Sequence, residues 1–394
     1  MSGEAADRYA DEWMATLTHL TPLARTVHDL LRWRRAGEGV AAHRAAAPTP
    51  GSDRLDHRCL PGLIPTGRLP RAMRHMRRCD ATVTGSPGAG WIALPSNVVN
   101  TPTNPSEQEP LACWPRTPRL DATELVRRLA AATGIGLQVD GRCPGGEVGA
   151  AYVRWPDGHR SVLTTGSPHA QPLVAIARQA GLPVPRYELV ADIGATFIVV
   201  QELRPGAAPT LVDRPLIEAM LALNARMHGL LHTRPDTRGI DLHLRASGPG
   251  YCLHEPLAGY DRRTRRVLDW ARDVGATRNA ADGIDLVHMD YHPGNILVSD
   301  GRIGAVIDWD GAGRGDRLLD LVTLRFDLAR RAPHLTDWLD SLLRQAVPAD
   351  RLRAYWAHMS LRLVDWAIRH HTNADVDLWI AIAEQGITGT HASY

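Results

Sequence analysis

Residues 285–310 of the chain read DLVHMDYHPGNILVSDGRIGAVIDWD. Two short apolar runs flank Asp300-Gly301, and this pattern predicts a β-hairpin with a tight turn. Asn295 enters the first strand and Asp308 leaves the second, so both side chains are expected at the open end of the hairpin. Asp290 precedes Asn295 by five residues and can reach the same point.

These three side chains suit one kind of chemistry. An amide and two carboxylates that converge offer hard oxygen ligands of the kind that Mg²⁺ prefers. Phosphoryl transfer from a nucleotide needs such a set, because one Asp accepts the proton of the attacking hydroxyl while an Asn and a second Asp hold the metal. The hairpin therefore predicts phosphoryl-transfer chemistry.

The order and spacing of these residues also carry a resemblance. Residues 288–295 read H-x-D-x-H-P-G-N, and residues 307–309 read I-D-W. This pair of motifs resembles the aminoglycoside phosphotransferase and choline kinase family, a branch of the protein-kinase-like fold, over about residues 121–394. The resemblance implies an α+β, two-lobed fold with a small mixed β lobe and a larger, mainly helical lobe. It also implies ATP, or another nucleoside triphosphate, and Mg²⁺ as cofactors.

The resemblance assigns roles to the residues of the two motifs. Asp290 is expected to be the catalytic base, and His288 to be a catalytic-loop residue that supports it. Asn295 and Asp308 are expected to bind magnesium. Asp320, further along the chain, is expected to tie down the catalytic loop.

Two upstream segments are candidates for nucleotide binding. The glycine-rich segment with Gly145, Gly146 and Gly149 resembles the flap that covers the ATP phosphates, although glycine pairs also mark ordinary tight hairpins. Glu202 and Leu203 precede a Pro-Gly turn and resemble the hinge whose backbone binds adenine.

The chain departs from the family in its missing phosphate-binding lysine. All 45 basic residues are arginine, which excludes Schiff-base chemistry and a Walker A loop. Related kinases place a Lys or Arg on the third strand, paired with a Glu on the next helix. Thr164 occupies the strand position here, and residues 167–180 contain no acid. Arg160 or Arg178 is expected to supply the charge; the alternative is a degenerate kinase that binds nucleotide poorly.

The chain divides into three predicted regions. Residues 1–118 form an extension, partly helical and poorly ordered, with a linker-like end rich in Gly, Pro, Ser, Thr and Asn. Residues 119–205 are expected to form the small lobe, which begins with a helix capped by Asp121. Residues 206–394 are expected to form the helical lobe with the catalytic loop.

The acceptor is less well defined by the sequence. The expected reaction is O-phosphorylation of a small hydroxylated molecule, with an aminoglycoside-like antibiotic as the leading candidate. Residues 311–394 contain ten acids and ten arginines, so their charge is balanced. Asp327, Asp365 and Glu384 are candidate contacts for a cationic acceptor. A metabolic kinase for a choline-like, sugar or amino-alcohol substrate, and a non-catalytic binding module, remain alternatives.

Composition excludes several other classes. A net charge of +2 without a concentrated basic patch argues against nucleic acid as a partner. No apolar stretch approaches the length of a spanning helix, and the first residues lack the pattern of a signal peptide, so a cytoplasmic location without membrane contact is expected. The sequence does not decide the oligomeric state.

Overall fold

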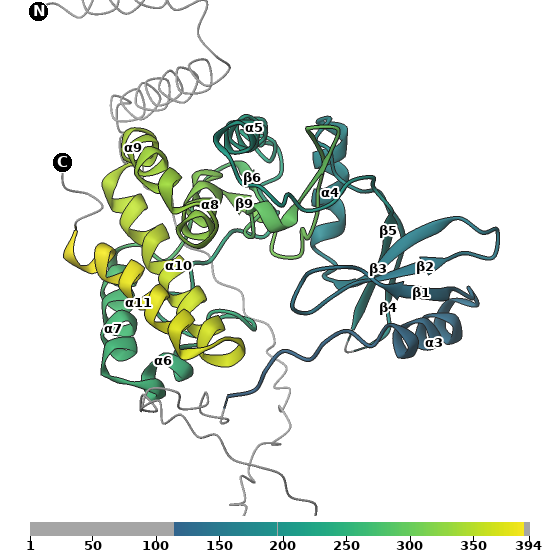
Figure 1. The fold of residues 1–394 in the computed structure, drawn as a ribbon, viewed down its shortest axis with the longest axis horizontal. Helices are drawn as coiled ribbons and strands as arrows, with labels where there is room; N and C mark the ends of the chain where they lie inside the picture. Colours follow the sequence, from purple (N-terminus) through teal and green to yellow (C-terminus); the bar gives the residue numbers. More distant parts are fainter. Residues whose placement is uncertain (1–113, 195, 390–394) are drawn as a thin grey trace, which may run out of the picture. The chain divides into compact units, whose positions relative to one another are not determined.

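The computed structural model describes residues 114–194 and 196–389. Most of the expected N-terminal extension, residues 1–113, lies outside the described residues. The described chain combines one five-stranded sheet, two short antiparallel strand pairs and a set of α-helices, so the α+β class is confirmed (Figure 1). Among the described residues, no helix has the length and hydropathy needed to cross a bilayer.

The first half of the described chain builds an antiparallel sheet. The strands are β1 (Gln138–Arg142), β2 (Ala151–Arg154), β3 (Arg160–Gly166), β4 (Tyr187–Asp192) and β5 (Phe197–Glu202). Their spatial order is β1-β2-β3-β5-β4, and each neighbouring pair is antiparallel.

One face of this sheet is covered by α3 (Ala122–Thr133) (Figure 1). The helix begins at Asp121, whose side chain accepts a hydrogen bond from the backbone of Glu124, and it ends at Gly134 with a φ of 74°. Leu125 and Leu129 of α3 belong to a core cluster with apolar side chains of β2, β3 and β5. The small core therefore lies between α3 and the sheet.

The helix after β3 packs differently from α3. This helix, α4 (Ala170–Gln179), buries Leu173, Val174 and Ala177 in the large core, together with Ile217 and Met220. The face is wholly apolar, so α4 offers no carboxylate to pair with a cation on β3. The ion pair is thus absent because neither α4 nor the position of Thr164 on β3 carries the required residue type.

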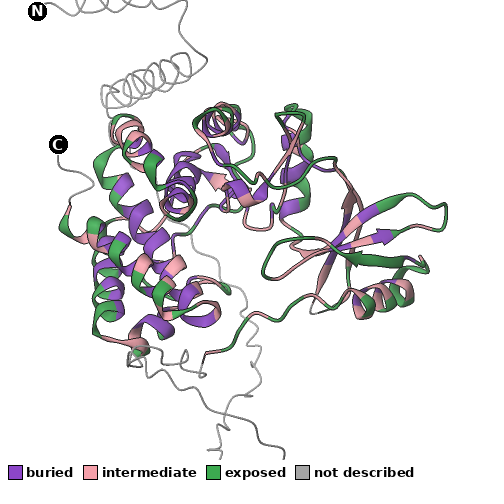
Figure 2. Cartoon of the chain, in the orientation of Figure 1, coloured by how far each residue is buried: buried purple, intermediate pink, exposed green. Residues whose placement is uncertain are grey.

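The second half of the described chain is mainly helical. Its α-helices are α5 (Arg214–Ala225), α6 (His254–Tyr260), α7 (Arg262–Thr277), α8 (Leu318–Arg331), α9 (Thr336–Ala346), α10 (Ala349–His370) and α11 (Asn373–Thr388). The central helix α10 packs against α6, α7, α8, α9 and α11. Figure 2 shows buried residues concentrated in α8 and α10, and Tyr355 and Trp356 are among the largest fully buried side chains.

Two short antiparallel pairs complete this half. Strands β7 (Ile296–Ser299) and β8 (Arg302–Val306) form the hairpin expected from the sequence, preceded by the 3-10 turn η1 (Pro293–Asn295). Strands β6 (Asp285–Val287) and β9 (Gly313–Gly315) pair around it, and the short turn η2 (Pro333–Leu335) links α8 to α9. Asp300 and Gly301 take φ values of 51° and 70°, as a two-residue hairpin turn requires.

Gly166 ends β3 at a place where a side chain does not fit. A Cβ there would lie 2.6 Å from Cγ2 of Val199 and 3.1 Å from Oδ1 of Asp310. We expect Gly166→Ala to lower the free energy of unfolding by about 1–3 kcal/mol, because the buried Val199 has to shift. Urea denaturation measures this change.

Gly136→Ala is the matched control, since a Cβ at Gly136 meets nothing within 4 Å. Equal denaturation midpoints for the two variants would show that the contact at Gly166 is not tight.

Candidate active site

The catalytic loop is held in a strained conformation by one buried carboxylate. Met289 takes a φ of 73°, which is costly for a residue with a side chain. Asp320 of α8 accepts hydrogen bonds from the backbone N–H groups of His288 and Met289, each at 2.8 Å. These two hydrogen bonds fix the loop that presents Asp290, as the family resemblance led us to expect.

His288 connects the loop to the hairpin. Its ring is fully buried; Nδ1 accepts from the backbone N–H of Asp290 at 3.2 Å, and Nε2 lies 3.0 Å from the carbonyl oxygen of Ile307. Burial lowers the pKa of His288 to about 4, so the ring is neutral near pH 7. His288 therefore positions the loop as a neutral ring, with its one proton on Nε2 directed at Ile307.

Asn295 lies directly against Asp290. Its Nδ2 donates to the backbone oxygen and to Oδ2 of Asp290, both at 2.9 Å. Because both amide hydrogens are directed at Asp290, the amide oxygen of Asn295 is the atom left for another ligand. The backbone oxygen of Asn295 also accepts from Ile307, which holds the end of β8 beside it.

Asp308 follows β8 with a φ of 67°. The surrounding protein and the negative charge of Asp290 raise the pKa of Asp308 to about 6. Within the described part of the chain, no group donates a hydrogen bond to its carboxylate. A carboxylate that accepts no hydrogen bond and lies near a second carboxylate is suited to binding a cation.

The donor set of this site fits Mg²⁺. Among the described residues, no group of three or more His, Cys, Asp or Glu side chains could hold a metal by itself. Mg²⁺ is usually held by one or two carboxylates together with waters and substrate phosphates. The carboxylate of Asp308 and the amide oxygen of Asn295 match that pattern.

Arg362 is a site residue that the sequence did not reveal. It comes from α10, and its guanidinium donates to Oδ1 of Asp290 at 2.8 Å and to the backbone oxygen of Met289. His292 also lies beside the base candidate, with Nε2 3.4 Å from Oδ2 of Asp290. Burial alone would raise the pKa of Asp290, but the charges of Arg362 and His292 outweigh it and hold that pKa well below its ordinary range. Asp290 is thus ionised.

The sequence profile of the phosphotransferase enzyme family matches residues 160–363, about half of the chain. The chain belongs to this family. The catalytic loop, the hairpin and Arg362 all lie within the matched residues.

Solved structures resemble the phosphotransferase in fold. A thermostable mutant of aminoglycoside phosphotransferase APH(4)-Ia, in a ternary complex with AMP-PNP and hygromycin B, matches with a TM-score of 0.50 and 17% identity, covering 69% of this chain and 100% of that chain. A candidate fructosamine-3-kinase from Thermobifida fusca YX-ER1 has a TM-score of 0.42 and 16% identity, covering 67% of this chain and 98% of that chain. No curated protein sequence matches significantly. At 17% identity the similarity to the first structure shows the fold alone, and the expected protein-kinase-like fold is confirmed.

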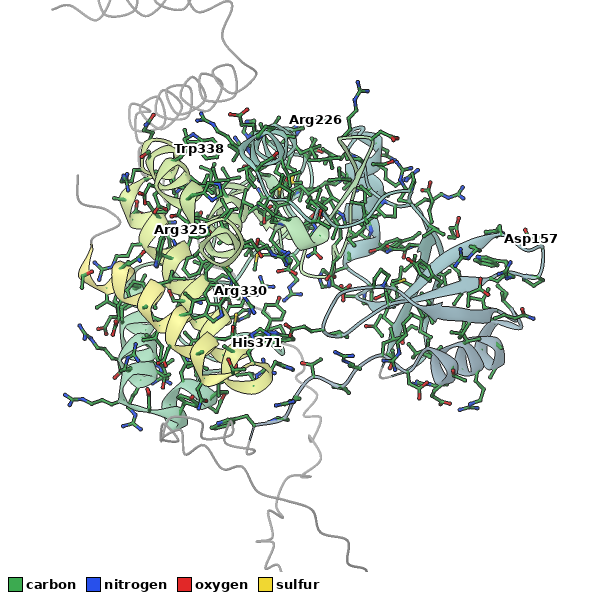
Figure 3. All side chains as sticks on the ribbon, in the orientation of Figure 1. Asp157, Arg226, Arg325, Arg330, Trp338 and His371 are labelled. Atoms are coloured by element: carbon green, nitrogen blue, oxygen red, sulfur yellow. The ribbon has the colours of Figure 1, made fainter. Side chains whose placement is uncertain are left out.

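The glycine-rich segment of the phosphotransferase connects β1 and β2. Gly145, Gly146 and Gly149 have φ values of 79°, 71° and 91°, which glycine adopts at little cost. Between them, Glu147 places Oε1 2.5 Å from Nε2 of His371, and it also accepts from the indole of Trp366. Figure 3 labels His371 just beyond the end of α10. The glycine segment therefore lies against the end of the helix that carries Arg362.

The two arginines proposed to replace the missing lysine both have protein partners. Arg160 pairs with Asp140 at 3.1 Å and lies over the ring of Tyr152, with 44% of its side chain exposed. Arg178 donates to the backbone oxygen of Val184 at 2.7 Å. A nucleotide contact by Arg160 or Arg178 remains a proposal, and it requires these bonds to rearrange.

The proposed hinge lies at the end of β5, which pairs with β3 and β4. The side chain of Glu202 accepts from the backbone N–H of Arg186 and from the guanidinium of Arg204, both at 3.1 Å. Leu203 comes next and is partly buried. The carboxylate of Glu202 already accepts these hydrogen bonds. The proposed binding of adenine therefore relies on the backbone groups of Glu202 and Leu203.

Two of the three acids proposed as contacts for a cationic acceptor already form ion pairs with arginines. Asp327 pairs with Arg331 at 3.0 Å, and the fully buried Asp365 pairs with Arg369 at 2.8 Å. Glu384 lies half-buried on α11. Asp327 and Asp365 are therefore poor partners for a substrate ammonium group.

Asp320→Ala tests how the catalytic loop is held. The change leaves the N–H groups of His288 and Met289 without their acceptor, so we expect the free energy of unfolding to fall by roughly 2–4 kcal/mol. Denaturant unfolding measures it, with the exposed Asp273→Ala on α7 as control, expected within about 0.5 kcal/mol of the wild type. A loss at Asp320 no larger than at Asp273 contradicts this account of the loop.

Proposed function

We propose that the phosphotransferase transfers the γ-phosphoryl group of ATP to a hydroxyl group of a small molecule. One observation carries this proposal: Asp290, Asn295 and Asp308 converge at the open end of one hairpin, with Asn295 bonded to Asp290 at 2.9 Å. This is the arrangement that in-line, metal-assisted transfer to an alcohol requires.

Each residue has a distinct task. Asp290 accepts the proton of the acceptor hydroxyl, because Arg362 and His292 keep it ionised. Asn295 and Asp308 would hold Mg²⁺, which supplies charge neutralisation at the phosphates when bound. His288 and Asp320 keep the loop in place. The glycines at 145, 146 and 149, together with the hinge at Glu202 and Leu203, are proposed to bind the nucleotide.

ATP and a cytoplasmic location belong to the same proposal. The similar fold of APH(4)-Ia was solved with the ATP analogue AMP-PNP, and this supports nucleotide use. ATP is abundant in the cytoplasm, where the sequence led us to expect the protein.

Two acceptor classes follow from the sequence. An aminoglycoside-like antibiotic, with a role in resistance, was the leading expectation, and APH(4)-Ia was solved with hygromycin B. Within the metabolic alternative, a sugar is favoured over a cationic substrate by a specific observation, the pairing of Asp327 and Asp365 with arginines, which removes two expected ammonium contacts.

The experiment is ADP release from ATP, measured with and without Mg²⁺ across antibiotics, sugars, sugar acids and amino alcohols. Turnover that depends on both Mg²⁺ and an acceptor supports the proposal. ATP binding with no Mg²⁺-dependent ADP release under any condition would leave the non-catalytic binding module as the better description.

A further inference from the structure

The helix α10 fixes a segment of chain next to the catalytic base. Three of its side chains bond the backbone of residues 242–253: His358 lies 2.8 Å from the oxygen of Leu242, Asp365 accepts from the N–H of Leu253, and Arg369 donates to the oxygen of Gly250. These bonds fix the segment that carries Tyr251.

Tyr251 and Arg362 form a pair beside Asp290. The guanidinium carbon of Arg362 lies 4.8 Å from the centre of the Tyr251 ring, while its NH2 group is 2.8 Å from Asp290. Among the described residues, the Tyr251 hydroxyl has no hydrogen-bond partner. A guanidinium has five donors in a planar fork, and two of them are bonded to protein acceptors. Donors of both residues thus remain for a ligand.

A second cation lies near this pair. Arg238 is exposed, and its NH1 comes within 3.4 Å of Nε2 of His169. Burial raises the pKa of Tyr251, while the positive charges of Arg362 and Arg238 act in the opposite direction. The field at the Tyr251 hydroxyl therefore includes both guanidinium groups.

Carboxylates in the helical half are largely matched with arginines. Figure 3 labels two of these, Arg325 and Arg330. The pairs are Asp316–Arg351, Asp327–Arg331, Asp340–Arg325, Asp365–Arg369 and Asp375–Arg330. An ammonium group on the acceptor would gain little from these five acids, because each is already paired with an arginine.

We propose that the acceptor is an alcohol with an anionic group, a carboxylate or a phosphate, and that Arg362 and the Tyr251 hydroxyl bind this group. The inference rests on the proposed function and names its substrate class. Asp290 takes the hydroxyl proton, the alcohol oxygen bonds to the γ-phosphorus, and the bond from the γ-phosphorus to the bridging oxygen breaks, so that ADP leaves with the electron pair. Arg362 keeps its bond to Asp290 through this step.

The test uses matched alcohols that differ in charge. One series is glucuronate, glucose and glucosamine; the other is glycerol 3-phosphate, glycerol and 3-amino-1,2-propanediol. The readout is phosphorylated product, by mass spectrometry, together with ADP release. We expect the anionic member of at least one series to exceed the neutral member at least about tenfold in kcat/KM, and the amine to be slowest.

Two variants test whether Arg362 and Tyr251 cause the preference for an anionic acceptor. Because Arg362 also touches Asp290, the ratio of anionic to neutral kcat/KM is compared within each variant, which cancels a general loss of rate. We expect Arg362→Gln to reduce this ratio to about twofold or less and Tyr251→Phe to reduce it several-fold. The control variant is Arg353→Gln, at an exposed position of α10, and it should leave the ratio unchanged. If Arg362→Gln has no measurable activity, the ratio for Tyr251→Phe decides.

Failure of this inference is distinct from failure of the proposed function. An amine or neutral alcohol as the best acceptor, no reaction with any anionic member, or an unchanged ratio in Tyr251→Phe overturns the inference. Mg²⁺-dependent ADP release in the same experiment leaves the phosphotransferase function standing. Its absence, with or without added alcohols, overturns both.

Discussion

Replacing Asp290 by Asn is expected to reduce kcat for phosphoryl transfer by about 10²–10⁴-fold. The amide has nearly the same shape but does not accept the proton of the acceptor hydroxyl. Arg362 also loses the charged partner that it contacts at 2.8 Å. A coupled assay of ADP release measures kcat, and the thermal unfolding midpoint shows whether the variant is folded.

Asp300→Asn is the matched control for this change. Asp300 lies exposed at the turn of the same hairpin with a φ of 51°, which Asn tolerates well. We expect its kcat within twofold of the wild type. An Asp290→Asn enzyme that is folded and keeps more than about a tenth of wild-type kcat rules out Asp290 as the base.

Replacing Asp308 by Asn is expected to cost about 10²–10⁴-fold in kcat/KM for ATP, because the metal loses its charged protein ligand. The backbone is expected to remain as it is, since Asn accepts the φ of 67° observed at Asp308. The rate should also require a much higher Mg²⁺ concentration for half-saturation. Titration of ADP release with Mg²⁺ separates this metal effect from a loss of ATP binding.

The outcome for Asp308 is compared with Asp300→Asn under the same Mg²⁺ titration. If both variants saturate at the same Mg²⁺ concentration as the wild type, Asp308 does not hold the metal. A change in half-saturation for Asp308→Asn alone assigns the metal site to the open end of the hairpin.

Some elements of the sheet were missed by reading the sequence, for a physical reason. Strand β1 reads QVDGR and is exposed along its whole length, so it lacks the apolar alternation that marks a half-buried strand. It exists because its backbone pairs with β2. In contrast, the cap of α3 at Asp121 is a local signal, and this helix begins where it was expected.

The sequence by itself determined the β7–β8 hairpin that carries the candidate site. Asp290, Asn295 and Asp308 are joined by one tight turn and two short strands, so local hydrogen bonds are enough to bring them together. The absence of an ion pair at Thr164 was equally visible, because it depends only on which residue types occupy β3 and α4.

Only the tertiary structure decided what surrounds Asp290, the proposed base. Arg362 lies 72 residues from Asp290, and Tyr251 is held beside it by bonds from α10 to a distant segment. Nothing in local periodicity distinguishes Arg362 from the other arginines of α10, because its role comes from the way a central helix packs against the catalytic loop. Packing of this kind is decided by the fit of whole surfaces, so the charge beside Asp290 could be read only from the folded chain.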